Sequence, residues 1–144
     1  MAPSRPLLAA VLLAASASPA LAAADIPFPG VVLQALDKVT ARTTILTLAL
    51  DRPVQYGSLT IVARACLETP PTEPPESAAF LEISSAEAGK PARAEFTGWM
   101  LASSPALSAL EHPVYDVWVL DCSADQASSL PEALEAPEPA TSSP

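Results

Sequence analysis

The chain has a single histidine, His112, with serines before it and an aspartate after it. Ser103 or Ser104 as nucleophile, His112 as base and Asp116 as the orienting acid would form a hydrolytic triad. The chain lacks the G-x-S-x-G pattern that exposes a nucleophilic serine on a sharp turn. Capping of a short helix explains the serines better, and His112-Pro113 is explained as the end of that helix. We therefore expect no catalytic residue here, with a small hydrolase as the alternative.

Two cysteines, Cys66 and Cys122, form the second candidate set. Together with His112 they are suitable zinc ligands, but a disulfide would compete for both thiols. A redox site would need closely spaced cysteines such as C-x-x-C. In an exported protein an isolated pair forms a disulfide, and this one closes a 57-residue loop. We predict a structural disulfide worth about 4 kcal/mol, no metal site and no cofactor.

Aromatic and apolar residues of the second half could form a binding surface. The candidate patch consists of Trp99, Met100, Leu107 and Tyr115, which could stack on a sugar or a peptide. We expect Trp118, which lies in an apolar run, to pack in the core near the disulfide. Asp116 shares its strand face with Trp118, and we expect a buried, structural ion pair between Asp116 and Arg64.

These residues must be positioned by strands. Short apolar and β-branched runs alternate with turn signals, which predicts strands over 31–36, 43–50, 58–67, 78–83, 92–101 and 114–121. Gly98 suggests a bulge or a group packed on the backbone. Residues 103–110 predict a short helix with Ser104 as cap and Pro105 at its first position. The fold class is therefore mostly β: a small antiparallel sandwich or partly open barrel of about six strands, with one short helix and one disulfide.

Alternation predicts which side chains share a face in two of these strands. In 58–67, Arg64 and Cys66 fall on the face opposite Leu59, Ile61 and Ala63. The last strand has two apolar faces, one holding Val114, Asp116, Trp118 and Leu120, the other Tyr115, Val117, Val119 and Asp121.

The two ends of the chain differ from this domain. Arg5, an apolar run over 6–17, and Ala20 and Ala22 at the −3 and −1 positions predict a secretory signal over 1–22, cleaved after Ala22. Residues 23–30 are an extended leader and 31–125 the domain. Residues 126–144, rich in Ala, Ser, Pro and Glu, predict a disordered acidic tail. No later segment approaches transmembrane length.

The formal net charge of the whole chain is −9, from 7 Lys and Arg against 16 Asp and Glu. Such a charge disfavours nucleic acid and anionic lipid as partners, because both would be repelled.

Four stretches together resemble one family: VLQALDKV at 32–39, Arg64-Ala65-Cys66, PESAAFLEI at 75–83 and the run from Phe96 to Cys122. The chain from about residue 31 to 122 resembles DUF2155, a family of exported alphaproteobacterial proteins of unknown function. The resemblance implies a Gram-negative periplasm and a family-wide disulfide. It implies no activity, and it places a protein of a respiratory membrane complex among the candidate partners.

We therefore expect a non-enzymatic periplasmic domain that binds an envelope protein. The apolar segment 98–110 and an unpaired sheet edge are the sequence features that support binding. The alternative is a small hydrolase, or a sugar- or peptide-binding module, that uses the region from Trp99 to His112.

Overall fold

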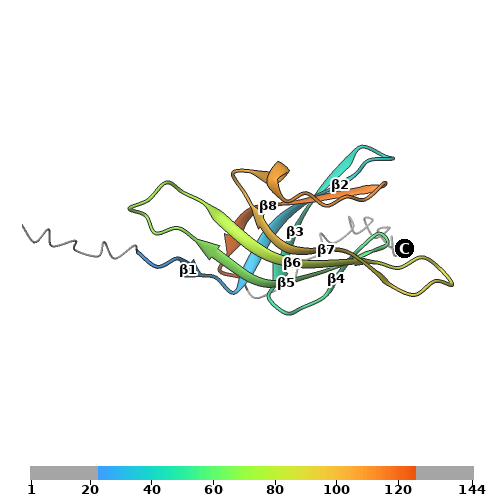
Figure 1. The fold of residues 1–144 in the computed structure, drawn as a ribbon, viewed down its shortest axis with the longest axis horizontal. Helices are drawn as coiled ribbons and strands as arrows, with labels where there is room; N and C mark the ends of the chain where they lie inside the picture. The colour runs from blue at the N-terminus through green and yellow to red at the C-terminus, as the bar shows by residue number, and fades with distance from the viewer. Residues whose placement is uncertain (1–22, 126–144) are drawn as a thin grey trace, which may run out of the picture.

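The computed structural model describes residues 23–125 as two antiparallel sheets (Figure 1). One sheet has the order β1-β5-β6-β7, with β4 also paired to β5, and the other has the order β3-β2-β8. The strands are β1 (Ile26–Pro27), β2 (Gly30–Asp37), β3 (Arg42–Ala49), β4 (Val54–Tyr56), β5 (Leu59–Glu68), β6 (Ser77–Ser85), β7 (Arg93–Leu101) and β8 (Tyr115–Ser123). The predicted mostly β fold of antiparallel sheets is confirmed. Within the described residues neither sheet closes into a barrel. The predicted signal and tail lie outside the described residues.

The predicted helix over 103–110 is wrong, because only a single 3-10 turn, η1 (Pro105–Leu107), forms there. Pro105 does begin the turn, but Ser104 makes no side-chain cap. Leu107 is 74% exposed while Leu110 is buried. Since Leu110 lies beyond the turn, the two leucines never form one helical face.

The core lies between the sheets and is built from alternate strand residues. Val31, Leu33 and Ala35 of β2 are fully buried, and so are the facing side chains of β5 and β6. Cys66 of β5 and Cys122 of β8 form a disulfide with a Cα–Cα distance of 5.7 Å. The predicted pairing is confirmed, and the bond joins one sheet to the other.

Three irregularities in the ladders change the alternation that the sequence predicts. In β5 the pairing shifts between Ala63 and Ala65, so Arg64 is the extra residue and Cys66 returns to the buried face. The prediction that Cys66 lies on the face opposite Leu59, Ile61 and Ala63 is therefore wrong, because a bulge reverses the alternation beyond it. The pairing of β2 with β8 shifts in the same way at Leu120.

The third irregularity concerns Gly98. This glycine pairs regularly with Leu81, and the bulge of β7 falls at Glu95 instead. The other expectation for Gly98, a group packed on its backbone, fits the structure, because the Phe96 ring lies against it. A Cβ added at Gly98 would be 3.5 Å from that ring.

The last strand buries Val117 and Val119 and turns Asp116 and Trp118 to the outer face. Trp118 is therefore half-buried and lies outside the core. The predicted Asp116–Arg64 pair is also wrong. Arg64 is exposed on the other sheet and bonds Asp51 at 2.9 Å and Glu82 at 2.8 Å. Since both faces of this strand are apolar in the sequence, alternation alone could not decide which one is buried.

Candidate functional site

A pocket of about 630 Å³ lies where the β6–β7 hairpin meets the loop before β8. Its size falls in the range of small-ligand and peptide sites. Figure 1 shows the hairpin at the end of the molecule opposite β1. The pocket is lined by Ser58, Ser85, Glu87, Lys90, Pro91, Ala92, Arg93, Glu95, His112, Pro113, Val114 and Tyr115.

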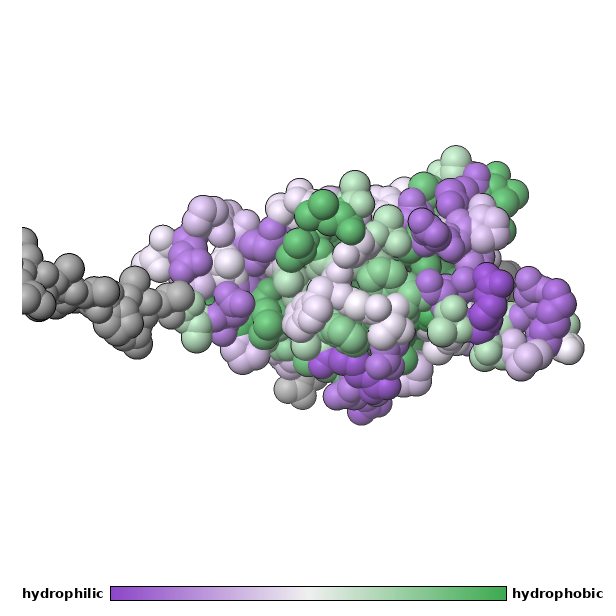
Figure 2. All heavy atoms as spheres, viewed as in Figure 1, coloured by the Kyte–Doolittle hydropathy of each residue, from purple (hydrophilic) through white to green (hydrophobic). Residues whose placement is uncertain are grey.

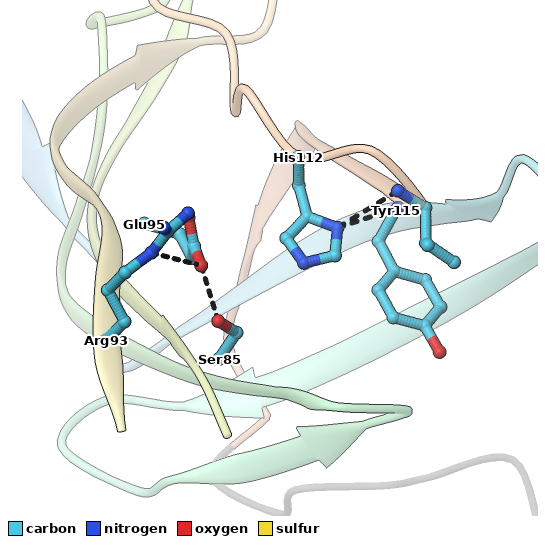
Figure 3. A network of polar contacts seen from close by, with 6 residues as sticks. Ser85, Arg93, Glu95, His112 and Tyr115 are labelled. Atoms are coloured by element: carbon cyan, nitrogen blue, oxygen red, sulfur yellow. Dashed lines mark hydrogen bonds and ion pairs between the residues drawn. The ribbon is translucent and has the colours of Figure 1, made fainter. Parts of the chain in front are cut away.

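A buried carboxylate, Glu95, forms one side of the pocket. Its side chain is only 5% exposed and accepts hydrogen bonds from Arg93 Nε at 3.2 Å and Arg93 Nη2 at 3.1 Å. The Ser85 hydroxyl also donates to it (Figure 3). The Arg93 guanidinium, followed by Ser85, holds the pKa of Glu95 below its ordinary value of 4.5. Glu95 is therefore ionised at neutral pH and acts as an acceptor only.

The imidazole of His112 lies on the other side. Its Nδ1 accepts the backbone N–H groups of Val114 at 3.2 Å and Tyr115 at 3.1 Å. Because Nδ1 accepts, the proton of the neutral ring is on Nε2. Figure 3 shows His112 between Tyr115 and the Ser85–Glu95 pair, with Nε2 on the side toward that pair. The ring therefore offers one fixed N–H donor to the pocket.

Aromatic packing fixes the position of this ring. His112 stacks on Tyr115, with ring centroids 5.4 Å apart and planes at 23°. Tyr115 in turn meets Tyr56 edge-on at 5.4 Å. The Tyr115 hydroxyl lies over Gly57, where an added Cβ would be 2.2 Å from it. Only a glycine fits there, since its φ of +57° is also left-handed.

The structure does not assemble the hydrolytic set considered from the sequence. Ser103 is held by Glu76 through both its hydroxyl and its N–H, the latter at 3.1 Å. Asp116 lies on the outer face of β8, opposite Leu36. A general base must accept through Nε2, but that atom carries the proton when Nδ1 takes two backbone donors. Ser103 and Asp116 are therefore not brought together with His112 at one site.

The zinc site considered from the sequence is also excluded, because the disulfide takes up both thiols. Across residues 23–125, no group of three or more His, Cys, Asp or Glu side chains is placed to hold a metal ion.

The predicted binding patch is not a single surface. Trp99 is 43% exposed and packs edge-on against Phe80 at 5.6 Å, and Leu107 is exposed on η1. Met100 is buried in the core, so its place in the patch is wrong: neighbours in a strand point to opposite faces. Tyr115 instead lines the pocket, and Trp99 is not among the lining residues.

Sequence reasoning missed Ser85, Arg93 and Glu95. The available signal was Gly89, which marks a turn between the strands predicted over 78–83 and 92–101. A hairpin through that turn pairs Ser85 with Arg93, two residues before Glu95. The bulge at Glu95, which the sequence did not indicate, then sets where this carboxylate points.

A second surface is the outer face of the β3-β2-β8 sheet. Ile45, Gln34 and Trp118 are cross-strand neighbours in one row, and Val32 and Leu36 lie on the same face. Ile45 is 49% exposed and Leu120 39%. An antiparallel sheet that covers a core on one side normally has polar residues on the other. This sheet has five apolar residues on that side, which we call the apolar outer face (Val32, Leu36, Ile45, Trp118 and Leu120), among polar cross-strand neighbours such as Gln34, Thr43 and Thr47.

Exposed hydrophobic residues also gather elsewhere. Figure 2 shows hydrophobic surface over η1 and at the tip of the β2–β3 hairpin, whereas the β6–β7 hairpin is hydrophilic. The tip contains Val39, which is 76% exposed. No helix in the described part of the chain is long and apolar enough to cross a membrane.

Comparison with known proteins gives a family. Residues 31–122 match the family described as "Uncharacterized protein conserved in bacteria (DUF2155)". A protein of Rickettsia prowazekii (strain Madrid E), itself described as uncharacterized, is 27% identical over 88 residues. The aligned part covers 61% of this chain and 57% of that relative, so the chain spans just over half of its length. No solved structure matches.

Proposed function

We propose that the chain, which belongs to the bacterial family DUF2155, is a non-enzymatic periplasmic domain that binds another protein of the cell envelope. The observation that carries the proposal is the apolar outer face. Large apolar side chains on a solvent-facing sheet are costly unless a partner covers them, and contiguous patches of this kind mark interaction sites.

The apolar outer face draws residues from all three strands of its sheet, with polar cross-strand neighbours between them. Ile45 comes from β3, Val32 and Leu36 from β2, and Trp118 and Leu120 from β8. Leu120 is the extra residue of the bulge in β8, and its side chain is exposed. Tryptophan is among the residues most enriched at the centre of protein interfaces.

The charges around this face suggest the chemistry of the partner. Asp116 is the cross-strand neighbour of Leu36, and Asp121 that of Val32. With a net charge of −9 over the whole chain, an apolar surface surrounded by basic residues would be complementary. A protein of a respiratory membrane complex is one candidate of this kind.

The periplasmic location rests on two features. The first 22 residues have the pattern of a secretory signal. The Cys66–Cys122 disulfide fits an oxidising compartment.

Photocrosslinking in cells tests the proposal. A benzophenone amino acid is placed at 45 or at 118, and captured proteins are identified by mass spectrometry. Position 107, also exposed, serves as comparison and represents the rival surface around Trp99. We expect one dominant envelope protein from 45 and 118, and weaker or no capture from 107.

A pair of variants controls for folding. Ile45→Lys should abolish capture from position 118, whereas Val39→Lys, a change at a more exposed apolar residue on the same hairpin, should not. Capture from 107 alone, or from no position, would refute the role of the apolar outer face.

A further inference from the structure

We infer that the pocket between the β6–β7 hairpin and the loop before β8 binds an uncharged peptide segment. In this arrangement His112 Nε2–H donates to a peptide carbonyl, and Glu95 accepts a peptide N–H. The inference rests on the proposed function, because it takes from it that the ligand is part of a protein. It adds a second contact with that protein, separate from the apolar outer face.

The charges of the pocket cancel among themselves. The lining contains two cations and two anions, and each is already in an ion pair: Lys90 with Glu87, and Arg93 with Glu95 at 3.1 Å. With no net charge and no unpaired charge in the lining, an electrically neutral ligand is the better match.

Glu95 and His112 have complementary remaining capacity for hydrogen bonds. The Glu95 carboxylate has about four acceptor positions and uses three, two for Arg93 and one for Ser85. His112 offers a single donor, because two backbone N–H groups fix Nδ1 as an acceptor. One free acceptor and one free donor are what a peptide group, with one N–H and one C=O, can satisfy.

The remaining walls suit the side chains of such a segment. Pro91, Ala92, Pro113 and Val114 supply apolar surface, and the His112–Tyr115 stack forms one side. Apolar walls with a few fixed polar groups are the usual composition of a ligand site.

Three peptides with the same side chains test the charge preference. The blocked peptide acetyl-Ala-Val-Ala-amide is uncharged; one relative has a free amine and the other a free carboxylate. Each is titrated into the ¹⁵N-labelled protein purified from the periplasm, and amide shifts of Ser85, Val114 and Tyr115 are followed. We expect saturable shifts with the blocked peptide and several-fold weaker binding of both charged peptides. Tighter binding of either charged peptide, or no saturable shift at these residues, would overturn the inference.

A substitution at His112 tests the donor. In His112→Asn the side-chain oxygen can still accept the backbone N–H groups of Val114 and Tyr115, and the amide nitrogen then takes the place of ring carbon Cδ2, so no donor remains at the position of Nε2. Loss of one hydrogen bond predicts about three- to tenfold weaker binding of the blocked peptide. Leu107→Ala, which changes an exposed residue outside the pocket, should bind as the unmodified protein does. A well-folded His112→Asn variant with unchanged affinity would refute the role of His112.

Should His112→Asn fail to fold, Glu95→Gln serves in its place. It keeps the size of the side chain but removes the charge that strengthens the bond to the peptide N–H, so binding should again weaken.

The two proposals fail separately. Pocket shifts with no capture from positions 45 and 118 would refute the proposed function of the apolar outer face alone. Capture from those positions without pocket shifts would refute only the peptide site.

Discussion

Reduction of the Cys66–Cys122 disulfide should remove a large part of the stability of the domain. The bond closes a loop of 57 residues, and its main effect is to restrict the unfolded chain. For this loop the chain-entropy relation gives about 4 kcal/mol at 25 °C. A domain of this size is stable by about 5–15 kcal/mol in total. The loss corresponds to a fall in the midpoint of thermal unfolding of about 15–30 °C.

The structure adds a second contribution. The bond joins β5 to β8 across the core, and both cysteines are buried, Cys66 at 1% exposed and Cys122 at 8%. In reduced protein both sulfur atoms stay in place. In Cys66→Ala/Cys122→Ala they are removed and leave a cavity, so this variant should be less stable than the reduced protein.

Urea unfolding followed by the fluorescence of Trp99 and Trp118 measures all three species. The order expected is oxidised, then reduced, then the double alanine variant, with about 4 kcal/mol between the first two. Reduced protein within 1 kcal/mol of oxidised protein would refute the reasoning, because it would mean that restriction of the unfolded chain contributes little.

Further predictions concern single residues. Arg93 and Ser85 lower the pKa of Glu95 from its ordinary value of 4.5, so the ionised carboxylate stabilises the fold at neutral pH. This stabilisation is lost as the pH falls below 4.5 and through the lowered pKa. Glu95→Gln should therefore lower the melting temperature at pH 7 but change it little near pH 3. Burial, followed by the neighbouring Asp121, raises the pKa of Glu68, so the ionised Glu68 destabilises the fold at neutral pH. Glu68→Gln should therefore raise the melting temperature at pH 7, and this gain should fade below about pH 4.5. If Glu95→Gln and Glu68→Gln changed the melting temperature alike across a pH series, both predictions would be contradicted. Gly57→Ala should cost more than about 2 kcal/mol in urea unfolding, because φ is +57° and the Cβ would meet Tyr115, whereas Gly89→Ala, at φ +77° with open space around it, should cost about 1 kcal/mol; equal losses would remove the assigned role of Tyr115.

The strands were predictable because their signal is local. Residues such as those of β3 and β6 alternate between buried and half-exposed positions, and β-branched residues with turn signals mark their limits. The short strands β1 and β4 have too few residues to show alternation, and they appear only because β5 pairs with them.

The bulges were not predictable in the same way. Arg64, Glu95 and Leu120 each lie in a run that reads as regular alternation, yet each is the extra residue in its ladder. A bulge forms where the packing of both sheets favours a bend, and that choice depends on partners distant in the sequence. Each bulge then reverses which side chains face outward, which is why Cys66 was assigned to the wrong face.

The candidate site shows the same division. His112 and Tyr115 could be selected from the sequence as a lone histidine and an aromatic residue. The hydrogen-bonding role of His112 could not be predicted, because it depends on which of its ring nitrogens accepts the backbone N–H groups of Val114 and Tyr115. The pocket also needs Glu95 opposite them, and only the folding of the β6–β7 hairpin against the loop before β8 places it there.

The sequence by itself determined the β class, the disulfide between its two cysteines and the family, because composition, alternation and a single possible pairing contain that information. The tertiary structure alone decided which face of each strand is buried, that Trp118 lies on the apolar outer face, and that Glu95 and His112 line one pocket whose cations and anions are paired with each other. These properties depend on cross-strand register and on contacts between the two sheets, and no local pattern in a chain with apolar residues on both faces of its strands specifies them.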